Sequence, residues 1–132
     1  MATVSQMIDQ VLAHMDGRPA WEVMRADEIE RGNEIVVPGE TSWLPEEDWD
    51  PTITVSRSGK EIRLIAILAL NPGRGAFRRM VSGIIAEGLT PVIIAPTNMM
   101  RDTLKRWGWF PRHVGSGWDH EEQWRPRKGW RP

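Results

Sequence analysis

Apolar runs and glycine-containing turns alternate between residues 61 and 107, and this alternation constrains the fold more than any other feature of the chain. Residues 61–70 are mostly apolar, which predicts a buried strand, and the turn 71–75 (Asn-Pro-Gly-Arg-Gly) follows at once. The apolar residues after the turn recur at helical spacing as far as Gly88. They are Phe77, Met80, Val81, Ile84 and Ile85. Residues 91–95 are a second short apolar run and predict another buried strand.

A strand, a helix and a strand of these lengths predict a parallel pair joined by a right-handed crossover. The glycine turn then opens at the carboxyl end of the first strand. A further helix is expected over 97–107, capped by Thr97 or Asn98 and stopped by Gly108.

The segments on either side of this block complete the expected fold. The spacing of apolar residues predicts a helix over 4–16 and a weaker one over 19–31. Three prolines and five acidic residues in 38–51 indicate a loop. Residues 52–55 alternate as a strand, and the turn that follows them makes a hairpin with the strand beginning at Glu61. The turn is expected at 56–59 and a last strand at 114–118.

These elements predict an α/β fold, a mixed twisted sheet with helices on both faces. A chain of 132 residues is the size of one domain. We expect that domain to cover residues 1–118, followed by a Trp-, Arg- and Pro-rich C-terminal tail over 119–132.

The charge is divided unevenly along the chain. Residues 1–60 hold 5 Lys/Arg and 12 Asp/Glu, a net of −7, whereas residues 61–132 hold 12 and 6, a net of +6. The second half therefore suits a phosphate-rich ligand. The absence of cysteine excludes disulfides, thiol nucleophiles and cysteine-ligated metals and fits a cytoplasmic protein. The longest apolar run has seven residues, against the ~20 that span a bilayer, so we expect no membrane segment.

The glycine turn is the strongest candidate site. Free amides beside the positive end of a helix dipole suit a phosphate or pyrophosphate. The residues expected to supply those amides are Gly73, Arg74, Gly75 and Ala76, with charge added by Arg74, Arg78 and Arg79. The equally weighted alternative is a turn that needs glycine only for its geometry. A dinucleotide-binding fingerprint would need a third glycine at Arg78, and no Gly-Lys-Ser/Thr loop occurs.

The block 61–107, with Leu-Lys-Arg-Trp-Gly-Trp at 104–109, resembles the centre of the GNAT superfamily of acyl-CoA-dependent N-acyltransferases. The resemblance covers about residues 52–118. In that family a Q/R-x-x-G-x-G/A turn meets the coenzyme A pyrophosphate, and Gly75 matches its middle glycine. Asn98 matches an Asn near the start of a later helix, and Gly108-Trp109 stands for a Gly-Phe pair.

Three positions depart from the family pattern. Pro72 occupies the Gln/Arg position, Phe77 the last small position, and Leu104 the place of a tyrosine that usually protonates the departing thiolate. The chain has no tyrosine at all.

The resemblance implies that acetyl-CoA, or a related acyl-CoA, binds between strands 61–70 and 91–95 and gives its acyl group to an amine. The amides of Arg74, Gly75 and Ala76 would hold the pyrophosphate, and Asn98 would touch the pantetheine side. The alternative is a non-catalytic descendant of this fold, a binding or structural protein such as one of a phage virion or of an interaction with a phage host. The partner would then be a protein rather than an amine acceptor, and a homo-oligomer is compatible with either function.

No residue stands out as the catalytic base or acid. His113 and His120 change charge near neutral pH, but their loops predict exposed side chains. Glu61 is expected to be a solvated hairpin residue. The spacing of His113, Asp119 and His120 matches no common metal site, so none is expected.

Aromatic and basic residues alternate near the C-terminus. Trp118, Trp124 and Trp130 recur every six residues among arginines, a pattern that can stack on single-stranded nucleic acid. We favour the alternative that some of these tryptophans fold back over the core, because only a short segment is basic. Trp43 and Trp49 are likewise expected to fill the core beneath the acidic loop.

Overall fold

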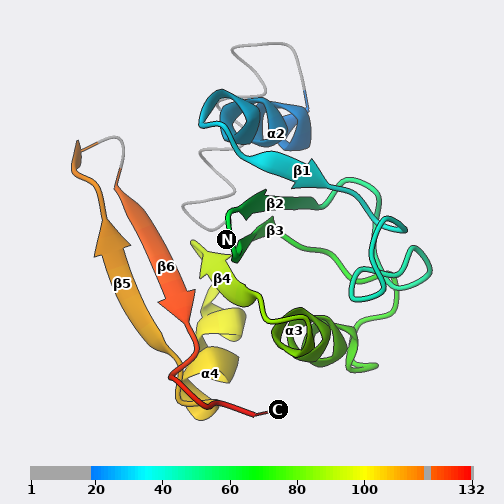
Figure 1. Ribbon diagram of the computed structural model, residues 1–132, viewed down its shortest axis with the longest axis vertical. Helices are drawn as coiled ribbons and strands as arrows, with labels where there is room; N and C mark the ends of the chain where they lie inside the picture. Colours follow the sequence, from blue (N-terminus) through cyan, green and yellow to red (C-terminus); the bar gives the residue numbers. More distant parts are fainter. Residues whose placement is uncertain (1–18, 118–119, 132) are drawn as a thin grey trace.

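The computed structural model describes residues 19–117 and 120–131, and the helix predicted over 4–16 lies outside them. Within these residues three helices and six strands alternate (Figure 1). The elements are α2 (Ala20–Glu30), β1 (Glu34–Val36), β2 (Thr54–Ser58), β3 (Glu61–Ala66), α3 (Ala76–Ala86), β4 (Thr90–Ile94), α4 (Asn98–Arg106), β5 (Phe110–Val114) and β6 (Glu121–Arg125). None of the described helices is long and apolar enough to cross a bilayer.

The six strands form one mixed sheet in the order β1-β2-β3-β4-β6-β5. β3 and β4 are parallel, and every other neighbouring pair is antiparallel. The α/β class and the parallel pair agree with the sequence prediction. The parallel pair lies in the middle of the sheet, with α3 as the crossover between its two strands (Figure 1).

Helices cover both faces of the sheet. Neighbouring residues of a strand point to opposite faces. In β6, Glu121 is bonded to Arg63, which also binds Glu28 of α2, whereas Glu122 is bonded to Arg101 of α4. α2 and α4 therefore lie on opposite faces, as the sequence predicts.

The apolar core is built from the sheet, the crossover helix and the acidic loop. Met80, Val81 and Ile84 of α3 are buried, as are Ile62 and Leu64 of β3. Trp43 and Trp49 are buried too, so the expectation that they fill the core beneath the acidic loop is confirmed. A Cβ added to Gly83 would lie 2.6 Å from the Cβ of Trp43, so only glycine lets the loop approach α3 this closely.

Three strand predictions differ from the structure. β2 runs to Ser58, so the turn expected at 56–59 is shortened to the residues around Gly59. β3 ends at Ala66, although the apolar run continues, because the chain beyond it leaves β4 and pairs with the acidic loop. β1 was not expected at all, since three residues are too short to show a sequence period.

The C-terminal prediction needs the largest correction. The last strand predicted over 114–118 is wrong, because β5 occupies 110–114 and a turn follows it. Residues 121–125, predicted to be part of an extended tail, form β6 and lie between β4 and β5 in the sheet. Trp124 is buried there against the core.

A buried cluster of charges joins α2 to β3 and β6. Arg63 donates to Glu28 at 2.7 Å and to Glu121 at 2.8 Å, and its side chain is only 9% exposed. Ser56 also donates to Glu28 at 2.5 Å. Since β4 lies between β3 and β6, the Arg63 side chain spans a strand to reach Glu121. The cluster therefore fixes both the helix and the C-terminal hairpin on this face.

Both carboxylates of the cluster are held in the charged form. Burial alone would raise the pKa of Glu28, but the hydrogen bonds from Arg63 and Ser56 and the charge of Arg63 outweigh it, so the pKa is lowered. Burial likewise opposes ionisation of Glu121, and the hydrogen bonds from Arg63 and Gln123 again lower the pKa below its ordinary value.

Replacing Arg63 by methionine should lower the free energy of unfolding by roughly 3–5 kcal/mol at pH 7, because two buried carboxylates lose their shared partner. A carboxylate whose pKa is lowered in the folded state stabilises the fold above its ordinary pKa of 4.5, and this stabilisation is lost as the pH falls through the pKa of the folded state. The difference in free energy of unfolding between the parent and Arg63→Met should therefore be smaller at pH 3 than at pH 7. Urea unfolding at both pH values measures this difference.

Arg57→Met, at an exposed arginine of β2, is the control. An equal loss at both pH values would contradict the role of the charges.

Candidate functional site

The candidate site lies where the parallel strands part. The ladder between β3 and β4 ends at the pair Leu64 and Ile93. On its other side β4 pairs with β6, and after β4 the amide of Ala95 continues this pairing by donating to the carbonyl of Glu122 at 2.9 Å. The chain after β3 turns the other way, and its Leu70 amide donates to the carbonyl of Asp48 at 2.9 Å. The two chains thus take different partners at their carboxyl ends.

The glycine turn leads into α3 without a side-chain cap. Gly75 is the N-cap residue with φ 78°, a left-handed conformation that favours glycine. Among the described residues no acceptor binds the amides of Gly73, Arg74, Gly75 or Ala76. The start of α4 is different, because the Thr97 side chain accepts from the Met100 amide at 3.2 Å. α3 therefore presents unpartnered donors at the positive end of its dipole.

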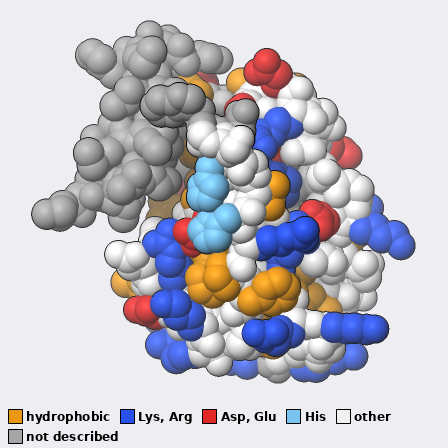
Figure 2. Space-filling view, turned by 90° about the vertical axis from the view of Figure 1, so that its left-hand side faces the viewer, with side chains coloured by type: hydrophobic (Ala, Val, Ile, Leu, Met, Phe, Trp, Pro, Cys, Tyr) orange, Lys and Arg blue, Asp and Glu red, His pale blue; other side chains and the backbone are white. Residues whose placement is uncertain are grey.

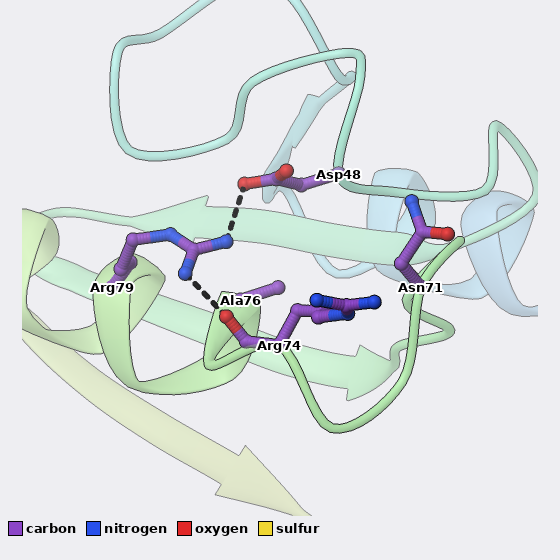
Figure 3. Close-up of a pocket in the computed structure, with 5 residues that line it drawn as sticks. All are labelled: Asp48, Asn71, Arg74, Ala76 and Arg79. Carbon is purple, nitrogen blue, oxygen red and sulfur yellow. Dashed lines mark hydrogen bonds and ion pairs between the residues drawn. The ribbon is translucent and has the colours of Figure 1, made fainter.

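A cavity of about 320 Å³ opens beside this helix start (Figure 3). Its lining residues are Asp48, Asn71, Arg74, Ala76 and Arg79. The guanidinium of Arg79 donates to the carbonyl of Arg74 at 2.5 Å and lies 3.3 Å from a carboxylate oxygen of Asp48. The Arg74 guanidinium extends instead toward Asn71 (Figure 3). The cavity thus holds one paired and one extended guanidinium beside free amides, an arrangement that suits an anion with several oxygens.

The four predicted turn residues lie together in the structure, whereas the other two predicted site residues, Arg78 and Asn98, lie apart from the cavity. Gly73, Arg74, Gly75 and Ala76 form the turn and the first residue of α3. Arg78 does not line this cavity. It lines a neighbouring groove with Gly75, Arg79 and Ser82, and its guanidinium carbon lies 5.9 Å from the ring centre of Trp107.

Asn98 lies on the other helix that begins near the parting strands. It is the first residue of α4, and its side-chain oxygen accepts from Arg101 at 2.8 Å. It does not line the cavity beside Arg74, so no described contact joins it to the turn.

The Phe77 ring does not line the cavity. Phe77 stacks on Trp107 with ring centres 5.3 Å apart, and so links the start of α3 to the end of α4. Its ring therefore fills the space between the two helices and leaves the helix start open.

Sequence reasoning about the site missed Asp48 and gave Asn71 and Arg79 only a minor part. Asn71 is the first residue of the turn and Arg79 follows it by four residues, so their nearness to the turn in the sequence was the available signal. Asp48 comes from the acidic loop, which is held against the chain after β3 by the bridge between Trp49 and Ala69. No sequence period marks that contact.

The residues considered for acid or base chemistry lie elsewhere. Leu104, which the GNAT resemblance matches to a tyrosine, is fully buried. Glu61 binds Arg125, and the hydrogen bond from that guanidinium lowers the pKa of Glu61, which makes it a weak base. His113 and His120 lie together on the β5–β6 hairpin. In 19–117 and 120–131, no three His, Cys, Asp or Glu side chains are arranged to hold a metal ion.

Two of the three C-terminal tryptophans pack against the core, and Trp118 lies outside the described residues. Trp124 is buried, and Trp130 lies 5.2 Å from Trp107 and 5.3 Å from Trp109 between ring centres. Both residues support the expectation that the tail folds back, and the buried ring of Trp124 is not free to stack on bases.

No protein-family model matches the sequence, and comparison with curated proteins and with solved structures finds no match.

Substituting Gly75 by alanine should destabilise the protein by about 1–2 kcal/mol, since a side chain is unfavourable at this left-handed φ. The added Cβ would also lie 3.3 Å from a nitrogen of Arg79, a flexible side chain that can move. Urea unfolding of Gly75→Ala measures the effect. Arg74→Ala, one residue earlier, is the matched control and should change stability by less than about 0.5 kcal/mol. Equal stability of Gly75→Ala and the parent would show that the turn does not need glycine.

Proposed function

We propose that the protein binds an acyl-coenzyme A and transfers its acyl group to an amine, as a small member of the GNAT superfamily. The observation that carries the proposal is the uncapped start of α3, flanked by Arg74 and Arg79, at the carboxyl end of two parallel strands that part. A pyrophosphate needs this combination of free amides and guanidinium groups.

The strand arrangement supports the same family. The resemblance implies a hairpin feeding a parallel pair, with the coenzyme lying where that pair opens. The hairpin β2–β3 precedes the parallel pair β3–β4, and the ladder of the pair ends after four residue pairs. The opening and the start of α3 both lie at the carboxyl ends of the parallel strands, so one extended ligand can contact both.

The anion would meet Arg74 first. Arg74 extends into the cavity, whereas Arg79 is already paired with Asp48. Asp48 holds the Arg79 guanidinium beside the turn, but its own negative charge opposes a phosphate, so the pyrophosphate is best placed on the side of Arg74 and the amides.

The transfer step needs little from side chains. The nitrogen of a deprotonated amine attacks the thioester carbonyl carbon, the C–S bond breaks, and coenzyme A leaves as a thiolate. The proton lost by the amine goes to water. Leu104 is buried where the family has its tyrosine, so water also protonates the thiolate. Catalysis would then consist mainly of positioning and of backbone donors facing the oxyanion.

Leu104 cannot donate a proton, and this favours a second candidate. The candidate is a non-catalytic protein, which either keeps the ligand site or has lost it. Such a protein would use the fold for binding or structure, for example in a phage particle. Phe77 adds to this candidate because its stack on Trp107 occupies space that a small residue would leave open. Binding and transfer therefore need separate tests.

Acetyl-CoA at 100 times its dissociation constant should stabilise the protein by about 2.7 kcal/mol and raise its melting temperature. The double variant Arg74→Ala/Arg79→Ala should weaken binding at least about tenfold, because it removes charge-assisted contacts. Arg57→Ala, an exposed arginine away from the cavity, should bind like the parent. Absence of any shift at millimolar acetyl-CoA would refute the ligand site.

Transfer itself is measured by the coenzyme A thiol released when acetyl-CoA is mixed with a panel of primary amines. A thiol reagent reads this directly, since the chain has no cysteine to react. The enzyme proposal expects release that depends on the amine and is lost in Arg74→Ala/Arg79→Ala. Binding without release on any amine in the panel would favour the non-catalytic candidate.

A further inference from the structure

The β5–β6 hairpin brings two histidines into contact that are seven residues apart in the sequence. His113 lies in β5 and His120 comes just before β6. Nδ1 of His113 is 3.0 Å from Nε2 of His120, and the two exposed rings lie within 12° of parallel. Figure 2 shows the pair side by side in the middle of this face, with Lys and Arg side chains around it.

We propose that His113 and His120 form a two-histidine site for a divalent transition metal ion, with Cu²⁺ bound more tightly than Ni²⁺. Imidazole nitrogens are the side-chain donors that these ions prefer among the groups present on this face. The site is distinct from the cavity beside α3 and does not depend on the acyltransferase proposal.

The distance between the two nitrogens is compatible with these ions. Metal–nitrogen bonds of about 2.0–2.1 Å to both atoms would subtend an angle of about 95° at the metal. Adjacent positions of a tetragonal or octahedral ion are about 90° apart, whereas a tetrahedral zinc site would need nitrogens about 3.3 Å apart. Cu²⁺ and Ni²⁺ adopt the first geometry.

Both rings are exposed, so an ion can reach them from solvent. Without metal, the two nitrogens share a proton as an N–H···N hydrogen bond, which a metal ion would replace once both rings turn so that their lone pairs converge on it. Glu122 faces His113 across the hairpin and supplies nearby negative charge. It is not a ligand, because Arg101 and the indole nitrogen of Trp124 already bind it. Water would complete the coordination.

Calorimetric titration of the untagged full-length chain with Cu²⁺, Ni²⁺ and Mg²⁺ tests the site. We expect one Cu²⁺ per chain, weaker binding of Ni²⁺ and none of Mg²⁺. His113→Gln and His120→Gln should each weaken Cu²⁺ binding at least tenfold, and the double variant should show no binding at this site. Electron paramagnetic resonance of the copper complex should show coupling to two nitrogens in the parent and fewer in each variant.

His14→Gln is the matched control, since it removes the third histidine of the chain and keeps both His113 and His120. It should bind Cu²⁺ like the parent. Circular dichroism melting shows that each variant is folded. Cu²⁺ binding that survives in folded His113→Gln/His120→Gln, or that is lost in His14→Gln, would overturn the proposal.

Discussion

The fold depends on one buried guanidinium. Arg63 lies on a central strand yet binds a carboxylate from α2 on one side and another from β6 on the other, across the intervening strand. Removing the cation would leave two buried carboxylates without a partner, and this loss of stability exceeds the net stabilisation that the intact ion pairs provide. The same contact sets the position of the C-terminal hairpin, because Glu121 is the first residue of β6. Helix, central strand and hairpin are thus fixed by a single side chain.

The parting of the parallel strands depends on the acidic loop. β4 pairs with β3 on one side and with β6 on the other, and Ile93 takes part in both ladders. The chain after β3 leaves β4 because Ala69 and Leu70 pair with the acidic loop instead. The strands therefore separate where the glycine turn begins α3. The cavity at this end of the strands combines the two halves of the chain, since Asp48 comes from the acidic half and both guanidinium groups from the basic half.

The sequence predicts the elements that have a local signature. α2, α3, β4 and α4 were all expected close to their observed bounds, because helical spacing, capping residues and glycine stops are read within a few residues. The turn residues were expected together for the same reason. Contacts between distant segments had no such signature. The approach of Asp48 to the turn depends on a bridge to Ala69, and the charged partners of Arg63 come from segments 35 and 58 residues away. β6 also has no local signature, because Trp124 is the only apolar residue in its sequence Glu-Glu-Gln-Trp-Arg.

The placement of β6 has a consequence for how the chain reaches its native state. β6 follows β5 in the sequence, but in the sheet it lies between β4 and β5, and β5 is the edge strand. β5 therefore has no strand to pair with until β6 has formed. The two strands can zip together as a local hairpin on the microsecond scale and then dock on β4 as a unit. That docking closes a long loop and buries a tryptophan, and so it is the step expected to limit the rate of folding.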